Sequence, residues 1–343
     1  MTLRWLLLLA LTLLAGCQHQ EPLYQEQGYV FGTLVEVSIQ GEPEARARQA
    51  VKAVMDEFQR LHTKLHAWQP SELSTLNAAF AQGRSQTVSP ELAAILQDAS
   101  RLSARSHGLF APQIGGLIHL WGFQADDFKA QLPDEQAIAE LVAAHPQMSD
   151  IDIEGERVSS RNPAVQLDLG GYAKGYALDR AAALLREMGI RNALVNIGGN
   201  VMALGRHGDR PWRVGIQHPR RPAALATLEP HDGEAVGTSG DYQRYFELDG
   251  RRYCHLIDPR SGHPAQGVEA VTVIAQGEHA GVLSDVASKA PYLTGPDGWA
   301  QAAHGMGIAQ AMLIDAAGRV HLTAALQKRL EFTDKDNAPL VEP

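Results

Sequence analysis

The spacing of apolar side chains changes along the chain, from helical intervals in the first half to strand-like runs in the second. Residues 43–65 carry apolar side chains three and four positions apart, at Val51, Val54, Met55, Phe58 and Leu61. This spacing predicts an amphipathic helix. Residues 89–107 begin with Ser-Pro and predict a second helix, because serine caps helices and proline suits their first position. Residues 124–150 favour a third helix.

Short runs rich in β-branched residues, separated by glycine-containing turns, dominate the chain from residue 151 onward. They cover residues 164–169, 192–200, 212–218, 235–240, 244–258 and 268–275, and residues 29–39 form a similar run near the N-terminus. Such runs predict strands, and Asp249-Gly250 predicts a hairpin turn. Two helices, at about 174–188 and 280–291, interrupt them. This order predicts one compact α+β or α/β unit over residues 28–330, with a mixed sheet, flanking helices and two lobes.

The N-terminus has the layout of an export signal. One arginine precedes a leucine-rich run that is short for a membrane span, so residues 1–16 are predicted to be a signal peptide. The Leu-Ala-Gly-Cys ending resembles a bacterial lipoprotein signal, which implies that Cys17 is lipidated; an ordinary signal with an incidental cysteine is the alternative. Residues 17–27 are then a tether and residues 331–343 a tail. By resemblance to lipoprotein sorting signals, Gln18 after Cys17 favours the outer membrane, so we expect a periplasmic, lipid-anchored protein.

Charge and cysteine content narrow the possible partners. Thirty basic and 39 acidic residues give a formal net charge of −9 at pH 7. An acidic chain without basic runs argues against nucleic acid as a partner. The chain has two cysteines, so lipidation of Cys17 leaves Cys254 without a partner for an internal disulfide.

One turn combines residue types that suit an anion. The stretch "DLGGYAKGYALD" spans residues 168–179 and joins a predicted strand to a predicted helix. Gly170 and Gly171 let the backbone approach a ligand closely, and the start of the helix offers free N–H groups. Lys174 lies where a cation opposes the helix dipole, which makes sense if an anion binds there, and Asp168 is a candidate to hold a metal or a ligand. A structural turn with a surface lysine explains the stretch equally well.

Three other places carry side chains capable of chemistry. His255 lies in a segment dense in charged residues, and its ordinary pKa near neutrality suits a general base. Asp285 begins an apolar helix, a position that equally suits a helix-capping aspartate. His62 and His66 lie four apart, a spacing that can hold a metal, but the glutamate of a zinc protease is missing, which favours a solvated helix end. The dinucleotide fingerprint, the Walker loop and the GxSxG elbow are absent.

Taken together, a series of segments resembles one family, the ApbE-type FAD:protein FMN transferases. The matching segments are "FGT" (31–33), "HAWQPSELSTLN" (66–77), "GLFAPQIGGLIHLWGF" (108–123), "DLGGYAKGYALD" (168–179), "VNIGGN" (195–200), "TSGDYQRYF" (238–246), "HLIDPRSG" (255–262) and "SDVASKAPYLTGP" (284–296). Each is short, but they follow the family's order over nearly the whole chain after the signal. The resemblance implies a T-fold-like ApbE architecture and a flavin transferase.

The resemblance also implies a reaction. FMN passes from FAD to a serine or threonine hydroxyl of an acceptor protein through a phosphoester bond, AMP leaves, and Mg²⁺ neutralises charge on the pyrophosphate. The implied acceptors are membrane redox subunits that face the periplasm. Two alternatives use the same residues: a metal-dependent FAD pyrophosphatase that yields FMN and AMP, and a non-catalytic FAD-binding lipoprotein.

Residue roles follow from the resemblance alone. It assigns His255 as the base that deprotonates the acceptor hydroxyl, and Asp285 with the Gly171 carbonyl as the metal site. It assigns contacts with FAD to a larger set: Phe31, Trp68, Phe110, Ala111, Pro112, Asp168, Lys174, Ile257 and Lys289. Many relatives have Asp where this chain has Ala111, so one polar contact with FAD is lost. Relatives commonly have Thr at the position of Lys289, whose ammonium cannot ligate Mg²⁺ while charged but can contact a phosphate oxygen.

Overall fold

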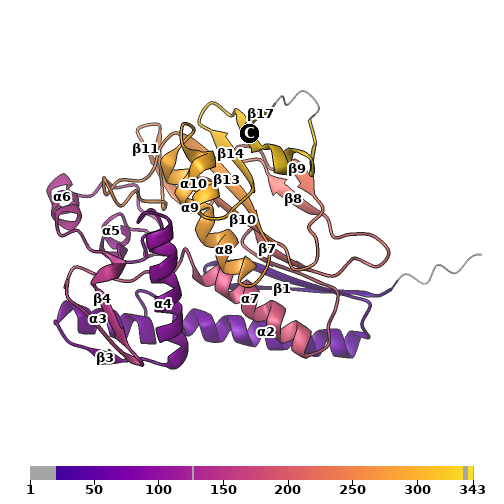
Figure 1. The fold of residues 1–343 in the computed structure, drawn as a ribbon, viewed down its shortest axis with the longest axis horizontal. Helices are drawn as coiled ribbons and strands as arrows, with labels where there is room; N and C mark the ends of the chain where they lie inside the picture. The colour runs from indigo at the N-terminus through magenta and orange to yellow at the C-terminus, as the bar shows by residue number, and fades with distance from the viewer. Residues whose placement is uncertain (1–20, 126, 335–338, 343) are drawn as a thin grey trace, which may run out of the picture.

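The computed structural model describes residues 21–125, 127–334 and 339–342, which are drawn as a ribbon in Figure 1. The predicted signal peptide, Cys17 and the first part of the predicted tether lie outside the described residues. In the described part of the chain, no helix is both long and apolar enough to cross a membrane.

A nine-stranded sheet forms the centre of the molecule. Its strands, in spatial order, are β1 (Leu23–Val30), β2 (Thr33–Gln40), β6 (Ala193–Ile197), β7 (Asn200–Leu204), β10 (Ala235–Gly240), β13 (Val268–Ala275), β14 (Gln310–Asp315), β15 (Val320–Thr323) and β17 (Leu340–Glu342). Neighbouring strands are antiparallel except β15 and β17, which are parallel, so the sheet is mixed as predicted. The pairing of β2 with β6 brings the two halves of the chain into one sheet.

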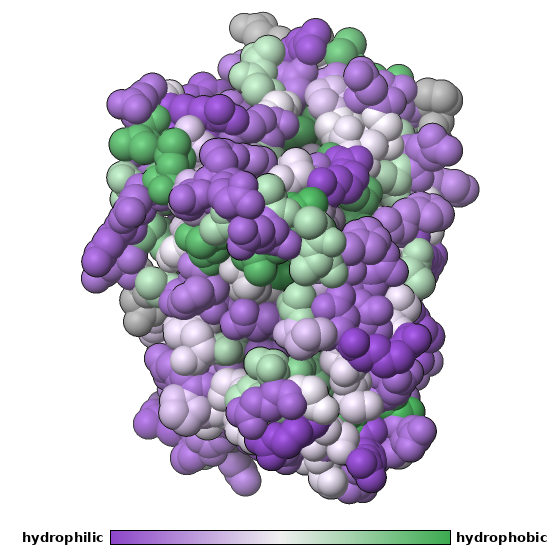
Figure 2. Space-filling view, turned by 90° about the vertical axis from the view of Figure 1, so that its left-hand side faces the viewer, coloured by the Kyte–Doolittle hydropathy of each residue, from purple (hydrophilic) through white to green (hydrophobic). Residues whose placement is uncertain are grey.

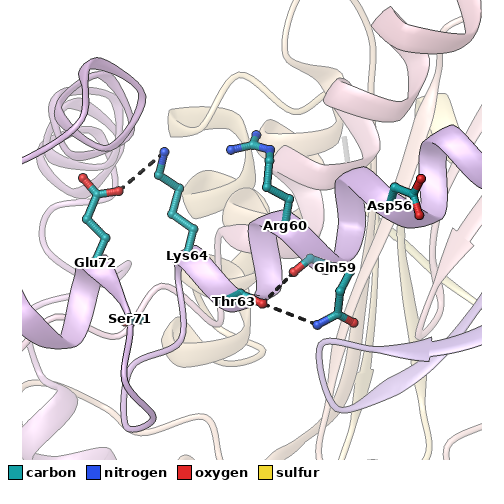
Figure 3. Close-up of a pocket in the computed structure, with 7 residues that line it drawn as sticks. All are labelled: Asp56, Gln59, Arg60, Thr63, Lys64, Ser71 and Glu72. Carbon is teal, nitrogen blue, oxygen red and sulfur yellow. Dashed lines mark hydrogen bonds and ion pairs between the residues drawn. The ribbon is translucent and has the colours of Figure 1, made fainter.

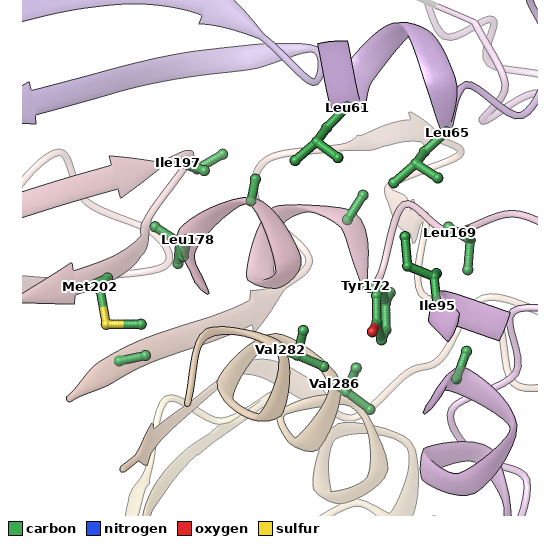
Figure 4. Close-up of a cluster of buried hydrophobic side chains, with 14 of the residues drawn as sticks. Leu61, Leu65, Ile95, Leu169, Tyr172, Leu178, Ile197, Met202, Val282 and Val286 are labelled. Carbon is green, nitrogen blue, oxygen red and sulfur yellow. The ribbon is translucent and has the colours of Figure 1, made fainter. Parts of the chain in front are cut away.

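Three helices form a layer over this sheet: α2 (Glu44–Lys64), α7 (Ala173–Glu187) and α8 (Ala280–Ala287). α7 packs against α2, α8, β6 and β7, and the three helices lie together in Figure 1. Their apolar side chains form one cluster, in which Leu61, Leu178 and Val282 point into the same interior space (Figure 4). Burying a side chain of this size contributes roughly 1.5–3 kcal/mol, so the cluster holds α7 and α8 firmly against each other.

A smaller sheet and a short helix pack on a second apolar cluster of the central sheet. The small sheet consists of β8 (Val214–Gln217), β9 (Ala224–Leu228) and β16 (Leu330–Phe332), and α11 (Ala324–Gln327) packs against β14 and β15. Because β13 contacts both clusters, every one of its residues is buried. A strand covered on both faces is apolar on both faces rather than alternating, and residues 268–275 follow this apart from the buried Glu269 and Thr272.

The remaining elements form the second lobe. Its helices are α3 (Glu72–Ala81), α4 (Pro90–Arg105), α5 (Gly115–Leu120) and α6 (Glu135–Ala143), and its other elements are β3 (Gln86–Thr87), the 3₁₀ turn η1 (Met148–Asp150), β4 (Ile151–Glu154) and β5 (Arg157–Ser160). The hairpin of β11 (Tyr245–Leu248) and β12 (Arg251–Cys254) packs on this lobe through rings that include Trp121, Phe123 and Phe246. Figure 2 shows the face that carries α6 and α3, where apolar residues form small groups among hydrophilic ones.

Most predicted elements are present. The Ser89 side chain caps α4 by accepting a hydrogen bond from the Leu92 N–H, with Pro90 at the first helical position. The predicted helix at 174–188 corresponds to α7, and the strand predicted at 268–275 matches β13 residue for residue. The prediction of a helix within 124–150 corresponds to α6.

The N-terminal strand prediction differs from the structure in an informative way. Residues 29–39 are not one strand but a hairpin of β1 and β2, turned at Phe31 and Gly32 with φ of 57° and 69°. A phenylalanine with positive φ is uncommon, so residue preferences alone do not indicate a turn there. β1 also begins at Leu23, inside the segment predicted as a tether.

Three other predictions are wrong in their boundaries. Residues 164–169 are not a strand and form only a bridge from Gln166 to Ile114. The helix predicted at 280–291 ends at Ala287, and α9 (Lys289–Thr294) and α10 (Trp299–Gly305) follow it. The predicted tail pairs with the sheets through the end of β16 and through β17.

Candidate active site

The predicted anion turn leads into a helix crossing that has no room for side chains. A Cβ on Gly175 of α7 would lie 2.4 Å from the Gly281 carbonyl oxygen of α8, and a Cβ on Gly281 would lie equally close to the Gly175 oxygen. On its other side α8 rests on β10, where a Cβ on Gly237 would lie 2.2 Å from the Ser284 oxygen. Asp285 therefore reaches α7, and its Oδ2 accepts a 3.0 Å hydrogen bond from the Gly175 N–H.

The start of α8 is capped from α7, by Asp179. Its carboxylate accepts hydrogen bonds from the N–H groups of Gly281, at 2.7 Å, and Val282, at 2.8 Å. Burial raises the pKa of Asp179 to about 6, although these two bonds act in the opposite direction. Asp285 is therefore not the cap of this helix but a second acid, 3% exposed, at the crossing.

Lys289 lies against both Asp285 and Gly171. It is the first residue of α9, and its Nζ donates to the Asp285 carbonyl oxygen at 2.6 Å and to Oδ1 at 2.9 Å. A Cβ on Gly171 would lie 2.5 Å from the lysine Cε. With 13% of its side chain exposed, the lysine fills the space between the carboxylate and the turn that begins α7.

Two more cations, Lys174 and Arg244, lie near the pair of Lys289 and Asp285. Lys174 is partly buried and forms no hydrogen bond or salt bridge with the described residues. Burial lowers its pKa, the charge of Asp285 opposes this effect, and the charges of Lys289 and Arg244 add to it. Arg244 follows β10 and donates from Nη2 to the Phe123 carbonyl oxygen at 2.6 Å. We call Lys174, Arg244 and Lys289, together with Asp285 and His255, the cation cluster.

His255 is the neutral member of the cation cluster. Burial, with the positive charges of Arg244 and Lys174, lowers the pKa of His255 to about 3. Its Nδ1 lies 3.2 Å from the Arg244 carbonyl oxygen. Because a carbonyl oxygen only accepts, Nδ1 carries the proton and Nε2 keeps a lone pair. The arrangement presents a neutral base beside three cations.

Asp168 ties the turn to the second lobe. Its Oδ2 accepts a hydrogen bond from Gln124 Nε2 at 3.0 Å, and its Oδ1 accepts one from the Gly170 N–H at 2.9 Å. Its own N–H donates to the Pro112 carbonyl oxygen at 2.7 Å, so the predicted FAD segment 110–112 runs directly beside the turn. Gln124 is buried, and its Oε1 has no partner among the described residues, which leaves one acceptor for a ligand here.

Aromatic and imidazole rings form a row at the C-terminal end of α2. The Phe31 ring lies 6.1 Å from that of Phe58 and 5.7 Å from that of His62. The row continues from His62 to His66 at 5.0 Å, and from His66 to Trp68 at 4.4 Å. The left-handed conformation of Phe31 costs roughly 1–2 kcal/mol, and such strain points to a function for the turn. The two predicted flavin contacts, Phe31 and Trp68, are thus connected through the rings of His62 and His66.

Comparisons with known proteins agree on one family. The model of the ApbE family matches residues 31–313. A Rhodobacter capsulatus protein named FAD:protein FMN transferase is 45% identical over 313 residues, 91% of this chain. The chain spans 59% of the length of that relative. A Klebsiella pneumoniae protein of the same name is 37% identical, over 72% of this chain and 73% of its own. This chain belongs to the ApbE family.

Solved ApbE structures share the fold. The ApbE protein of Thermotoga maritima matches with a TM-score of 0.82 at 29% identity, covering 90% of this chain and 99% of that one. The apo form of the flavinyl transferase ApbE from Pseudomonas stutzeri gives a TM-score of 0.78 at 30% identity, covering 91% and 98%. The predicted α+β class with a mixed sheet and flanking helices is therefore confirmed.

The ApbE resemblance implies a divalent metal on Asp285 and the Gly171 carbonyl, and the residues present do not fit one. Both carboxylate oxygens of Asp285 accept hydrogen bonds, one of them from Lys289. Unit charges roughly 4 Å apart interact by about 4 kcal/mol at an effective dielectric constant of about 20, and a dication doubles the repulsion with the ammonium. Among the described residues, no three His, Cys, Asp or Glu side chains form a metal-binding group.

The hollow in Figure 3 is a separate place on this ApbE protein. Its volume is about 590 Å³, and it is lined by Asp56, Gln59, Arg60, Thr63, Lys64, Ser71 and Glu72. Its cations are matched by acids, because Arg60 binds Glu57 and Glu91, and Lys64 binds Glu91 and Glu72. A hollow whose charges cancel does not attract an anion, whereas in the cation cluster the charges of three cations act on one buried imidazole.

The structure separates the predicted residues into groups. Asp285, Lys289, Gly171, Lys174 and His255 come together, as the family order implies. Three other predicted contacts lie in apolar surroundings: Phe110 and Ile257 are buried, 3% and 5% exposed, and Ala111 packs against the apolar cluster of the second lobe.

Two polar residues of the site are not identified by the sequence analysis. Arg244 lies within the matching segment "TSGDYQRYF", where a cation between aromatic residues is the available signal. Gln124 lies one residue beyond the matching segment 108–123. The packing of the second lobe against the central sheet brings Gln124 to Asp168 and the Phe123 carbonyl to Arg244. These contacts join residues that are far apart in the sequence.

Proposed function

We propose that this ApbE-family protein transfers the FMN part of FAD to a serine or threonine hydroxyl of an acceptor protein and releases AMP. The observation that carries the proposal is the cation cluster, in which the charges of Lys174, Arg244 and Lys289 act on the neutral imidazole of His255, and Lys289 is paired with Asp285. Positive charges gathered in one place suit the negatively charged pyrophosphate of FAD. Phosphoryl transfer depends mainly on positioning and electrostatics, so the cluster needs no covalent nucleophile. The name shared by the relatives supports this reaction.

The reaction is a displacement at the phosphorus on the FMN side of the pyrophosphate. The acceptor oxygen forms a bond to that phosphorus while the bond to the bridging oxygen breaks, and AMP leaves with that oxygen and its electron pair. His255 Nε2 takes the hydroxyl proton, because the imidazole is neutral and its Nδ1 faces the Arg244 carbonyl. A pKa near 3 makes His255 a weak base in the free protein. The bound pyrophosphate, being negative, raises this pKa and strengthens the base.

The flavin and adenine rings of FAD bind against the aromatic row and the segment beside the turn. Phe31 and Trp68 offer ring faces, and Trp68 is 39% exposed. Planar aromatic ligands gain roughly 0.5–1.5 kcal/mol from each ring pairing beyond simple burial. Gln124 and Asp168 supply polar contacts on the other side of the turn.

The location of the protein is part of the proposal. Lipidation of Cys17 anchors the chain to a membrane, the outer one by preference, so that the transferase works in the periplasm on redox subunits that face it. Cys254 is a buried free cysteine, and burial raises the pKa of its thiol to about 11. A buried, protonated thiol is inert, which fits a chain without an internal disulfide.

The test is an intact-mass measurement on an acceptor. The purified protein is incubated with FAD, Mg²⁺ and a reporter domain that carries a Ser-Gly-Ala-Thr segment, and AMP is quantified in parallel. We expect an FMN-sized mass gain on the reporter and one AMP for each adduct. AMP and free FMN without an adduct would instead indicate the pyrophosphatase, and intact FAD after long incubation would indicate a binder without activity.

A further inference from the structure

We propose that the ammonium of Lys289 takes the place of the divalent cation at the pyrophosphate, so that this protein transfers FMN without a resident metal. The inference rests on the proposed function and goes beyond it by naming the group that neutralises the phosphate charge. It starts from the one position where the chain departs from the family at the implied metal site.

The position of Lys289 is set by a break between two helices. α8 ends at Ala287 and α9 begins at Lys289, and the Ser288 hydroxyl at the break donates to the Asp285 carbonyl oxygen at 2.8 Å. Ser288 is also paired with Ser239 of β10 at 2.7 Å between hydroxyl oxygens. The break is thus tied to the central sheet, and the lysine side chain returns along α8 to the Asp285 carboxylate.

The ammonium lies among the groups that the resemblance assigns to the metal. Nζ bonds to the Asp285 carboxylate and carbonyl, and it lies 3.4 Å from the place of a Cβ on Gly171. Gly171 could not be any other residue without displacing the lysine, since its Cβ would lie 2.5 Å from Cε. The glycine of the turn therefore makes room for the Lys289 side chain as well as for the ligand.

Charge balance favours an ammonium over a metal here. Lys289 places a positive charge directly beside Asp285, on a side chain that is 13% exposed. A threonine at this position would remove that charge and leave a neutral oxygen ligand, and a dication would then complete both the charge and the coordination. Lysine is a compact point charge with three donors, which suits a phosphate oxygen and a carboxylate at once.

In the reaction, Lys289 neither gains nor loses a proton. Its Nζ–H groups bond to a non-bridging phosphate oxygen while keeping the contact with Asp285, and its charge stabilises the oxygen that leaves with AMP. Asp285 is then a positioning residue, which acts through the lysine instead of a metal. The expected consequence is a transferase that tolerates chelators.

The experiment compares wild type with Lys289→Thr in EDTA and in Mg²⁺, by the mass-gain assay on the same reporter domain. Wild type is expected to change less than about twofold between the two conditions. Lys289→Thr is expected to lose roughly 10²-fold in EDTA, as when one electrostatic stabiliser is removed, and to recover at least tenfold in Mg²⁺. Lys52→Thr is the matched control, since Lys52 forms an i,i+4 pair with Asp56 on an exposed face of α2, and it should behave as wild type.

A second readout does not depend on catalysis. Electron paramagnetic resonance with Mn²⁺ as the probe, in the presence of FAD, should show a bound ion in Lys289→Thr and none in wild type. Lys289→Met keeps the length without charge or oxygen, and should lose transfer in both conditions without binding Mn²⁺. Circular dichroism confirms that each variant is folded.

The outcomes separate the two proposals. Wild type that needs Mg²⁺ for transfer, or Mn²⁺ bound equally by both proteins or by neither, overturns the role of Lys289. Wild type that makes no adduct in either condition overturns the transferase, while Mn²⁺ binding confined to Lys289→Thr still supports the ammonium in the place of the metal.

Discussion

Two groups of charges on neighbouring helices of this protein have opposite balances. At α2, Arg60, Lys64 and Arg180 face Glu57, Glu72 and Glu91, and every cation is bonded to an acid. We call these six residues the balanced network. In the cation cluster, the charges of Lys174 and Lys289 act on the Asp285 carboxylate, and Lys174 has no hydrogen-bonded partner among the described residues. The balanced network pairs its charges within the fold, whereas the cation cluster, under the proposed function, binds the anionic pyrophosphate of FAD.

The difference lies in how the backbone places the charges. The balanced network joins half-exposed arginines, such as Arg60 at 44%, to acids that still reach water at 14–25% exposure, and water-accessible ion pairs contribute roughly 0–1 kcal/mol each. The cation cluster is built where glycines let α7, α8 and β10 approach, so its carboxylate is nearly inaccessible to water. Buried cations held close together are unfavourable for stability, and under the proposed function they are retained to bind FAD.

The largest expected effect comes from the base. His255→Ala should lower the rate of FMN transfer by roughly 10²–10⁴-fold while FAD still binds, because the cations that hold the pyrophosphate remain. Adduct formation followed by mass spectrometry, with FAD affinity from calorimetry, measures both quantities. A rate within threefold of wild type would remove His255 from the mechanism.

Substitutions of Lys174 in the cation cluster and of Arg60 in the balanced network should have different effects. Lys174→Met should weaken FAD binding by about 10- to 100-fold, since hydrogen bonds to charged groups contribute roughly 1.5–3 kcal/mol. Arg60→Met should leave the dissociation constant of FAD unchanged and lower the free energy of unfolding by about 1 kcal/mol. Calorimetry and urea denaturation on both variants test this, and equal losses of FAD affinity would erase the distinction.

The close crossing of α7 and α8 at Gly175 and Gly281 affects both the stability of the fold and the position of Asp285. Gly175→Ala places a Cβ 2.4 Å from the Gly281 oxygen and 2.8 Å from the Asp285 Cβ, so we expect a loss of about 1–3 kcal/mol in the free energy of unfolding together with slower transfer. Gly305→Ala is the control, because it lies in α10 with nothing within 4 Å of its Cβ position. That variant should be as stable as wild type or slightly more stable; equal behaviour of the two variants would contradict the close crossing.

The smallest effect is the acid sensitivity of the balanced network. Arg60 and Lys64 lower the pKa of Glu91 to about 2, below its value of roughly 4.3 in an unfolded chain. The stabilising contribution of Glu91 is therefore present above that unfolded value and is lost as pH falls toward 2. Glu91→Gln should flatten the fall in the free energy of unfolding between pH 5 and pH 3, by about 1 kcal/mol or less. An unchanged slope would show that Glu91 does not contribute.

Sequence patterns predict the elements of this fold better than the contacts that complete the site. β13, α4 and α7 follow from local periodicity and capping, and their boundaries agree with the structure. The turn at Phe31 is missed because a left-handed phenylalanine breaks the residue preferences on which strand prediction depends. The family order identifies His255 and Asp285, since those residues lie inside recognisable segments.

Long-range contacts explain the residues that remained hidden. Gln124 reaches Asp168 across 44 positions, and the need for Gly237 arises only when α8 rests on β10. The sequence indicates that Lys289 is unusual for the family, but not that its ammonium returns to Asp285. That geometry depends on the break after α8, where one predicted helix proves to be two.

The most direct test of the central claim is the affinity of the metal-free protein for FAD. Titration calorimetry with wild type in EDTA and then in Mg²⁺ measures whether the cation cluster alone satisfies the pyrophosphate. The account predicts dissociation constants that agree within about twofold, and a dependence on Mg²⁺ that emerges only in Lys289→Thr. Binding by wild type that tightens tenfold or more on adding Mg²⁺ would contradict it.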